Sequence, residues 1–298
     1  MIYANYIASE VDCEWLAFAD DFKLGMFCDR GNLSRVQDAG RQLQRDLDSV
    51  VERSSSWNLR LNPDKCVAMR FGSKSNVAKV DTKYVVNGRE LAFVDCYRDL
   101  GVVVDPSLRF HLHINSVVGK AGSLMGELLR GTVCRTREFM LALFISHIRP
   151  LLDYCSCVWN VGYLSDVRRL ESVQRRWTRE VGGLGHMEYG DRLRALGLFS
   201  ISGRLLRADL IKLWRVMRGD LVGELLGLVS VAPDSRARGH RYKLLVPACR
   251  SEMLRRFFGI RCVTVWNGLP SELMEVGTLD SFKRGLSESL SDVLYRVL

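Results

Sequence analysis

Two adjacent aspartates, Asp20 and Asp21, lie between short apolar runs in segment 16–24, which reads LAFADDFKL. Neighbouring carboxylates repel each other, so the pKa of one is raised unless a cation lies beside them. Such oxygen donors suit Mg²⁺, which usually shares its ligands with substrate phosphates. A pair of these ions can activate a 3′ hydroxyl and stabilise a leaving pyrophosphate. Because Asp-Asp also occurs in ordinary turns, a purely structural turn is the alternative.

The segments around the aspartates must hold them in place. Residues 13–29 are expected to form two strands joined by a tight turn at the aspartate pair, because β-favouring apolar residues precede and follow it. Ser34 is a predicted N-cap. Apolar residues then recur every three or four positions over 36–51, with charges on the other face. This spacing predicts an amphipathic helix that ends near 54–56.

The remaining chain changes character near Pro106. Before it, two hairpins are expected, 59–62 with 67–71 and 84–86 with 90–94, followed by a strand at 101–105. After it the pattern favours helices. These helices are expected at 110–130, 136–149, 165–181, 190–218 and 279–297. We therefore expect an α+β chain with a domain boundary near residue 106.

Composition and charge narrow the function classes. The 298 residues are 47% hydrophobic, which is ordinary for a globular protein, and no apolar run is long enough to predict a transmembrane helix or signal peptide. The net charge of +9 is unevenly divided: residues 1–105 hold 14 Lys+Arg against 16 Asp+Glu, and 106–298 hold 29 against 18. This difference predicts a polyanionic partner for the second part, with a merely basic surface as the alternative.

The helix expected at 165–181 is rich in arginine on the faces that its apolar stripe leaves free. The five arginines are Arg168, Arg169, Arg175, Arg176 and Arg179. Guanidinium groups pair with phosphate oxygens in a bidentate way, so this array predicts contact with a nucleic-acid backbone. The alternative is a solvated helix face.

The cysteines favour no metal site. All nine lack a C-x-x-C spacing and are expected to be reduced and mostly buried. Cys155 with Cys157, and His111 with His113, are the close pairs of soft ligands. A structural zinc site needs four ligands at characteristic spacing. Buried thiols and an exposed histidine face are therefore expected.

The motif Phe18-Ala19-Asp20-Asp21 between two apolar strands resembles the YxDD-type motif of reverse transcriptases, with phenylalanine in place of tyrosine. Other blocks continue the resemblance in order along nearly the whole chain. They are IYANYI at 2–7, LNPDKC at 61–66, DLGV at 99–102, RPLLDY at 149–154 and WNGLP at 266–270. The chain resembles the C-terminal half of a non-LTR (LINE-type), jockey-like retrotransposon reverse transcriptase, truncated at its N-terminus.

This resemblance implies an RNA-directed DNA polymerase that extends a primer 3′ end with dNTPs on an RNA template. It implies that Asp20 and Asp21 are catalytic and bind Mg²⁺ or Mn²⁺, and that Phe18 and Lys65 lie beside the nucleotide. The arginines at 165–181 would contact the template and primer. The implied domains are a partial palm at 1–105, a helical thumb-like region at 106–189 and a basic, helical or mixed region at 190–298.

Reverse transcriptases hold their metals with a further aspartate from an earlier palm strand, and the nineteen residues before Asp20 show no such block. We therefore hypothesise that the chain alone does not polymerise. A non-catalytic nucleic-acid-binding remnant and a basic protein-interaction module remain alternatives. An incomplete palm would also expose a sheet edge and favour self-association, and the family implies action in the nucleus.

Overall fold

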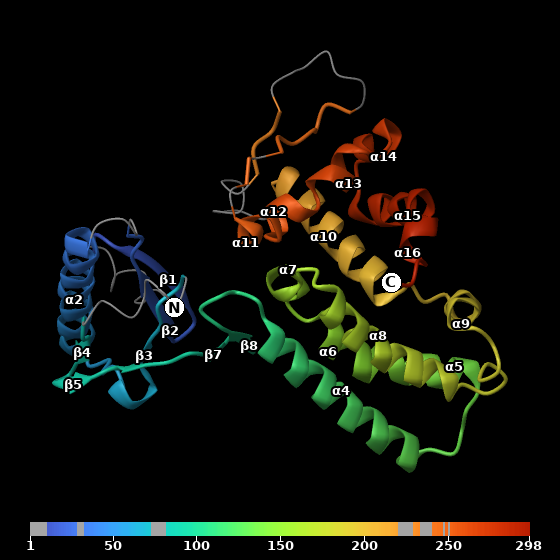
Figure 1. The fold of residues 1–298 in the computed structure, drawn as a ribbon, viewed down its shortest axis with the longest axis horizontal. Helices are drawn as coiled ribbons and strands as arrows, with labels where there is room; N and C mark the ends of the chain where they lie inside the picture. Colours follow the sequence, from blue (N-terminus) through green and yellow to red (C-terminus); the bar gives the residue numbers. More distant parts are fainter. Residues whose placement is uncertain are drawn as a thin grey trace. The chain divides into compact units, whose positions relative to one another are not determined.

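The computed structural model describes residues 11–28, 33–72, 82–219, 229–232, 240–246, 248–249 and 251–298 (Figure 1). The chain forms two compact units. The first, here called the hairpin unit, takes in Met1–Arg98 and Asp105–Ser107. The second, the helical unit, takes in Asp99–Val104 and Leu108–Leu298. The fold is α+β, and the division into partial palm, thumb-like region and basic region stays a prediction.

The aspartate-bearing hairpin forms as the sequence predicts. Strands β1 (Glu14–Phe18) and β2 (Asp21–Gly25) pair antiparallel, with Phe18 opposite Asp21. The loop between them is only Ala19 and Asp20. Ala19 has φ 54°, in the left-handed region that tight two-residue hairpin loops use. The alternating apolar residues therefore close the hairpin directly at the aspartate pair.

Helix α2 (Leu33–Ser56) confirms the predicted amphipathic helix. It begins one residue before Ser34, so Ser34 lies in the first turn rather than at the predicted N-cap. Its inward face contributes Val50, which is fully buried, and the buried carboxylate of Asp46.

One of the two further hairpins is confirmed and the other is wrong. Strands β4 (Val85–Val86) and β5 (Arg89–Glu90) pair antiparallel around Asn87 and Gly88, whose positive φ values of 50° and 77° suit this tight turn. The proline turn instead forms a 3-10 helix, η1 (Pro63–Lys65).

The strand after η1 does not fold back on 59–62. Residues 59–62 form no strand, so strand β3 (Val67–Ala68) has no partner there and pairs instead in parallel with β6 (Ala92–Phe93). Strands β7 (Tyr97–Asp99) and β8 (Val102–Val104) follow, and β8 confirms the strand expected at 101–105.

The helical unit contains the expected helices, several of them divided. The first part holds α4 (His111–Gly131), α5 (Arg137–Leu143), the π-helix η2 (Phe144–Ile148), α6 (Arg149–Asp153), α7 (Ser156–Trp159), α8 (Leu164–Arg179), α9 (Tyr189–Leu196) and α10 (Ile201–Met217). The last part holds α11 (Glu252–Arg255), α12 (Phe258–Arg261), α13 (Val263–Asn267), α14 (Ser271–Glu275), α15 (Leu279–Ser289) and α16 (Ser291–Leu294).

Two of the predicted long helices are interrupted. The stretch 190–218 breaks where Gly197 takes the left-handed conformation with φ 62° and ends α9. Ser200 then caps α10, because its side chain accepts a hydrogen bond from the backbone N–H of Gly203. The stretch 279–297 likewise divides into α15 and α16.

Two hydrophobic clusters form the core of the helical unit. One joins α4, α5, α8 and α9 and contains the fully buried Trp159 and Trp177. The other joins α12 to α15 and contains Trp266 and Phe282. Helix α10 lies between α8 and α15 in Figure 1 and contributes residues to both clusters. Among the described residues, no helix is long and apolar enough to cross a membrane.

Candidate catalytic hairpin and nucleic-acid interface

The tip of the β1–β2 hairpin presents the predicted catalytic residues to the surface. Asp20 and Asp21 are both exposed, and neither carboxylate makes an ion pair or hydrogen bond with the described residues. Phe18, on the strand before them, is 63% exposed although it is a large apolar side chain. Two uncompensated carboxylates beside an exposed aromatic ring are free to bind a cation and a planar ligand.

The base of the hairpin is fixed to α2 by a buried polar contact. The backbone N–H of Cys13 donates to Asp46 Oδ2 at 2.9 Å, and Gln42 Nε2 donates to Asp46 Oδ1 at 3.0 Å. Burial, and then the hydrogen bond and charge of Asp46, raise the pKa of Cys13 to about 12. Higher along the hairpin, Trp15 and Phe22 stack with ring centroids 5.9 Å apart.

Lys65 lies in the last position of η1 and is exposed. Asn62 caps this turn, since its Oδ1 accepts from the backbone N–H of Asp64 at 3.0 Å. Asp64 also pairs with Arg89, which ties the turn to β5. Lys65 therefore lies on a turn that these contacts hold in place, in the same unit as the hairpin. Its role beside a nucleotide stays a prediction.

The described residues contain no group of three or more His, Cys, Asp or Glu side chains that could hold a metal ion. Asp20 and Asp21 thus lack a third protein ligand within this part of the chain. The motif IYANYI at 2–7 lies outside the described residues.

Helix α8 carries the predicted arginine array as expected. Its apolar stripe is buried, with Val167, Leu170, Val173 and Trp177 between 1% and 7% exposed. The five arginines all lie on exposed positions: Arg168, Arg169, Arg175, Arg176 and Arg179. The helix therefore presents a cationic face while its other face anchors it in the core.

A buried polar cluster holds α8 against α9 and α10. Glu171 accepts hydrogen bonds from the hydroxyl of Tyr189 and, at 2.9 Å, from the backbone N–H of Ile201. Burial raises the pKa of Glu171 in spite of these bonds. Arg175 lies over the Tyr189 ring, 4.8 Å from its centroid. Because these partners come from three helices, the direction of the arginine face is well determined.

The DLGV block at 99–102 forms a close contact within the helical unit. The hydroxyl of Tyr154 donates to the carbonyl of Leu100 at 2.9 Å. A Cβ at Gly101, which has φ 88°, would approach the Tyr154 ring to 3.2 Å. Glycine is therefore needed here both for the backbone conformation and for space.

The expected exposed histidine face is wrong at one position. His113 is only 4% exposed, because its Nδ1 accepts from the backbone N–H of Val103 at 3.2 Å and its ring packs 5.6 Å from that of Trp159. His111 is partly exposed and its Nδ1 lies 2.5 Å from Asp166 Oδ2.

The cysteines are also less buried than predicted, although all nine are free thiols. Cys13 and Cys262 are buried, whereas the others are partly or fully exposed. Eight of the nine cysteines lie in bends, turns and loops between the helices and strands, and Cys157 lies in α7.

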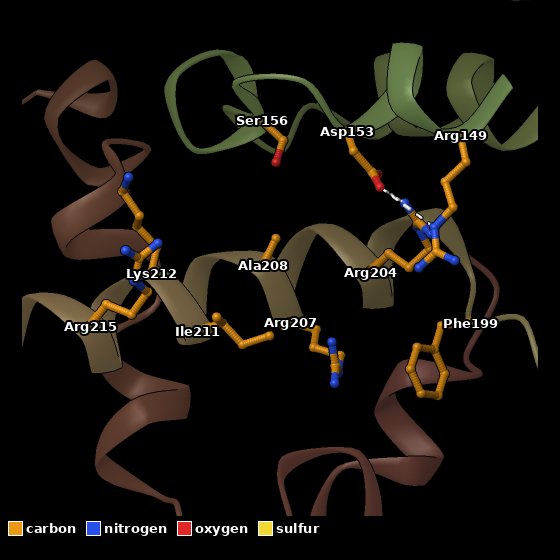
Figure 2. Close-up of a pocket in the computed structure, with 10 residues that line it drawn as sticks. All are labelled: Arg149, Asp153, Ser156, Phe199, Arg204, Arg207, Ala208, Ile211, Lys212 and Arg215. Carbon is orange, nitrogen blue, oxygen red and sulfur yellow. Dashed lines mark hydrogen bonds and ion pairs between the residues drawn. The ribbon is translucent and has the colours of Figure 1, made fainter. Parts of the chain in front are cut away.

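A cationic groove along α10 is the feature that sequence reasoning missed. It is lined by Arg149 and Asp153 of α6 and by four basic residues of α10 (Figure 2). The signal was present, because Arg204, Arg207, Lys212 and Arg215 recur at helical spacing on one face.

Comparisons with known proteins fit these observations. The chain is 24% identical over 151 residues to the RNA-directed DNA polymerase from mobile element jockey of Drosophila funebris. The matched segment covers 50% of this chain and 16% of that protein. It is 22% identical over 144 residues to the jockey polymerase of Drosophila melanogaster, covering 47% and 15%. It is 23% identical over 174 residues to the probable RNA-directed DNA polymerase from transposon BS of Drosophila melanogaster, covering 57% and 19%.

The chain is related to reverse transcriptases of non-LTR retrotransposons, as its motifs predict. Within that class, the polymerases of jockey and BS are among the proteins it is similar to, and the matched segments span less than a fifth of their length. No family model matches the chain. No solved structure matches it either.

Proposed function

We propose that this chain takes part in RNA-directed DNA synthesis, with the hairpin unit acting as part of a polymerase palm. The observation that carries the proposal is the pair of exposed, unpaired carboxylates, Asp20 and Asp21, at a two-residue hairpin loop. Similarity to the polymerases of mobile elements supports it. In this assignment residues 106–189 form the thumb, and 190–298 form a basic extension.

Asp20 and Asp21 would hold Mg²⁺ or Mn²⁺ together with phosphate oxygens of a dNTP, since hard divalent cations accept such mixed oxygen ligands. When bound, the ions would activate the primer 3′ hydroxyl and stabilise the leaving pyrophosphate. The ring of Phe18 provides an exposed apolar surface for the nucleotide. Lys65 provides a positive charge for its phosphates.

The five arginines of α8 would contact the phosphate backbones of the RNA template and DNA primer. Contacts of this kind are independent of sequence, and each one makes the affinity more sensitive to salt. The division of charge supports this role, because the basic residues are concentrated after residue 105.

Primer extension by the purified full chain tests the polymerase proposal. With an RNA template, a DNA primer, dNTPs and Mg²⁺ or Mn²⁺, incorporation that Asp20→Asn and Asp21→Asn abolish would assign catalysis to the hairpin and would contradict the hypothesis that the chain alone does not polymerise. Asp12→Asn is the matched control, because Asp12 is also an exposed aspartate of the hairpin unit. Incorporation that survives Asp20→Asn would show that the hairpin is not the catalytic site.

A second candidate is a nucleic-acid-binding protein without polymerase activity. The lack of a third carboxylate beside Asp20 and Asp21 among the described residues favours it. In that case the wild-type chain gives no extension but binds the template–primer with an affinity that falls steeply as salt rises. Affinity that ignores salt would instead favour a protein-interaction module.

We also propose that the hairpin unit self-associates through a strand edge. Strands β1 and β2 form a two-stranded sheet within the described residues, and an unpaired strand edge can pair with another chain. Sedimentation velocity should show concentration-dependent assembly. A monomer at every concentration would contradict this proposal.

A further inference from the structure

The groove along α10 has a volume of about 280 Å³ and carries an excess of positive charge. Five cationic side chains line it, and Asp153 is its one carboxylate. The cations are Arg149, Arg204, Arg207, Lys212 and Arg215. All of these residues belong to the helical unit, so the groove is complete within one compact body.

Arg204 has two side-chain nitrogens without a hydrogen-bond partner among the described residues. It is only 7% exposed, and its Nη2 pairs with Asp153. Its Nε and Nη1 are buried and have no hydrogen-bond partner among the described residues. An unsatisfied buried donor costs about 1–3 kcal/mol, and more when it is charged. An anion in the groove would supply the missing acceptors.

The neighbouring cations repel one another. Burial lowers the pKa of Arg149, and the charge of Arg204 lowers it further. Burial, and then the charge of Arg204, also lower the pKa of Arg207. Asp153 is shared between Arg204 and Arg149, whose Nε lies 3.7 Å from it, so one carboxylate does not balance the group.

Four of the five cations form two sets at the two ends of the groove, and Arg207 lies between them (Figure 2). Arg149 and Arg204 lie at one end, and Lys212 and Arg215 at the other. The side chains of the latter two make no ion pair or hydrogen bond with the described residues. Arg204 and Lys212 are eight positions apart on α10, which is about 12 Å at 1.5 Å per residue. This length exceeds one phosphate group and suits a ligand with successive phosphates.

We propose that the α10 groove binds the phosphate backbone of a single nucleic-acid strand, with Arg204 and Lys212–Arg215 each contacting different phosphates. Phe199 and Ile211 line the same groove and offer apolar contact to sugars or bases. The inference rests on the proposed function for its choice of nucleic acid over other polyanions. It adds a second binding surface to the arginine face of α8.

Fluorescence anisotropy with a labelled 20-nucleotide single-stranded RNA tests this site on the full chain. The variant Lys212→Gln/Arg215→Gln should weaken binding about tenfold at low salt. The slope of its plot of log Kd against log salt should be smaller by about 1.4, because each of the two lost contacts to single-stranded nucleic acid changes this slope by about 0.7. Folding should be retained, since neither side chain makes an ion pair or hydrogen bond that would be lost, and circular dichroism checks this.

The matched control is Lys120→Gln/Arg130→Gln, which removes the same charge from exposed positions of α4. An equal loss of affinity in both variants would overturn the proposal, because only net charge would then matter. Inorganic phosphate provides a second arm. If phosphate raises the Tm of the wild type but not of Lys212→Gln/Arg215→Gln, while both bind RNA equally, the groove is a free-anion site and the proposal is wrong.

The result is independent of polymerase activity. A chain that does not extend primers but loses RNA affinity on Lys212→Gln/Arg215→Gln keeps this inference and loses the polymerase proposal. A chain that extends primers, and whose RNA affinity is unchanged in that variant, keeps the polymerase proposal and loses this inference.

Discussion

The hairpin unit and the helical unit differ in how much apolar surface they bury. Among the described residues, the hairpin unit buries only four apolar side chains, Cys13, Val50, Val86 and Leu91. The helical unit contains both large hydrophobic clusters and all three of the fully buried tryptophans. The proposed catalytic carboxylates therefore lie on the less buried unit, and the proposed strand-binding surfaces lie on the better packed one.

This difference has a physical consequence. Stability arises mainly from buried apolar surface, at roughly 25 cal/mol per Å². The helical unit can hold its cationic side chains in fixed positions, including the buried Arg204, because its core is large. The hairpin unit depends more on individual contacts, such as the hydrogen bond of Cys13 to Asp46 and the stacking of Trp15 on Phe22.

The largest expected effect comes from truncating a core tryptophan of the helical unit. Trp177 is 1% exposed, packs near Phe144, and donates from Nε1 to the carbonyl of Met140 at 3.2 Å. Trp177→Ala should lower the free energy of unfolding by about 4–5 kcal/mol. Trp57→Ala in the hairpin unit, where the side chain is 38% exposed, should cost far less. Urea denaturation followed by circular dichroism measures both, and equal losses would contradict the comparison.

A somewhat smaller effect is expected from breaking a buried ion pair of the helical unit. Arg261 Nε and Nη2 each donate to Asp209 at 2.8 Å, and Asp209 is 2% exposed. Arg261→Met would leave this carboxylate unpaired and should cost about 3–4 kcal/mol. Arg89→Met, which breaks the exposed pair with Asp64 in the hairpin unit, should cost at most about 1 kcal/mol.

The pH dependence of Arg261→Met identifies the cause. Burial raises the pKa of Asp209 even with Arg261 present, and loss of the guanidinium raises it further. A carboxyl whose pKa is higher in the folded state binds its proton more tightly there, so its contribution to stability decreases as pH rises. The variant should therefore be least destabilised near pH 4 and most destabilised above neutrality. A destabilisation that does not change with pH would mean that lost packing, not the unpaired carboxylate, is responsible.

The sequence predicted local structure well where one periodicity dominates. The β1–β2 hairpin, α2, α4 and α8 follow directly from alternating or helical spacing of apolar residues. It failed at 59–71, where β3 pairs with the distant β6 rather than with its neighbour. Such pairing depends on tertiary contacts, which short-range patterns do not encode.

The candidate site was likewise predictable only in part. The aspartate pair and the arginines of α8 are close in sequence, so their exposure follows from single elements. The α10 groove requires Arg149 and Asp153 from α6 to meet the basic face of α10. The burial of His113 requires contact with Trp159. Neither meeting can be read from residue spacing, because it depends on how helices pack.

The smallest expected effect, in the reactivity of two buried thiols, gives the sharpest comparison of the units. Burial raises the pKa of both Cys13 and Cys262 to about 12, so at pH 8 both are almost entirely protonated and unreactive. Hydrogen bonds at Thr136 lower the pKa of the exposed Cys134, which should react first with iodoacetamide.

In urea below the main transition, Cys13 should become alkylated before Cys262, because fewer buried contacts protect the hairpin unit. Mass spectrometry measures each site, with fully unfolded protein as the control for intrinsic reactivity. Alkylation of Cys262 before Cys13 would show that the hairpin unit is the more stable of the two.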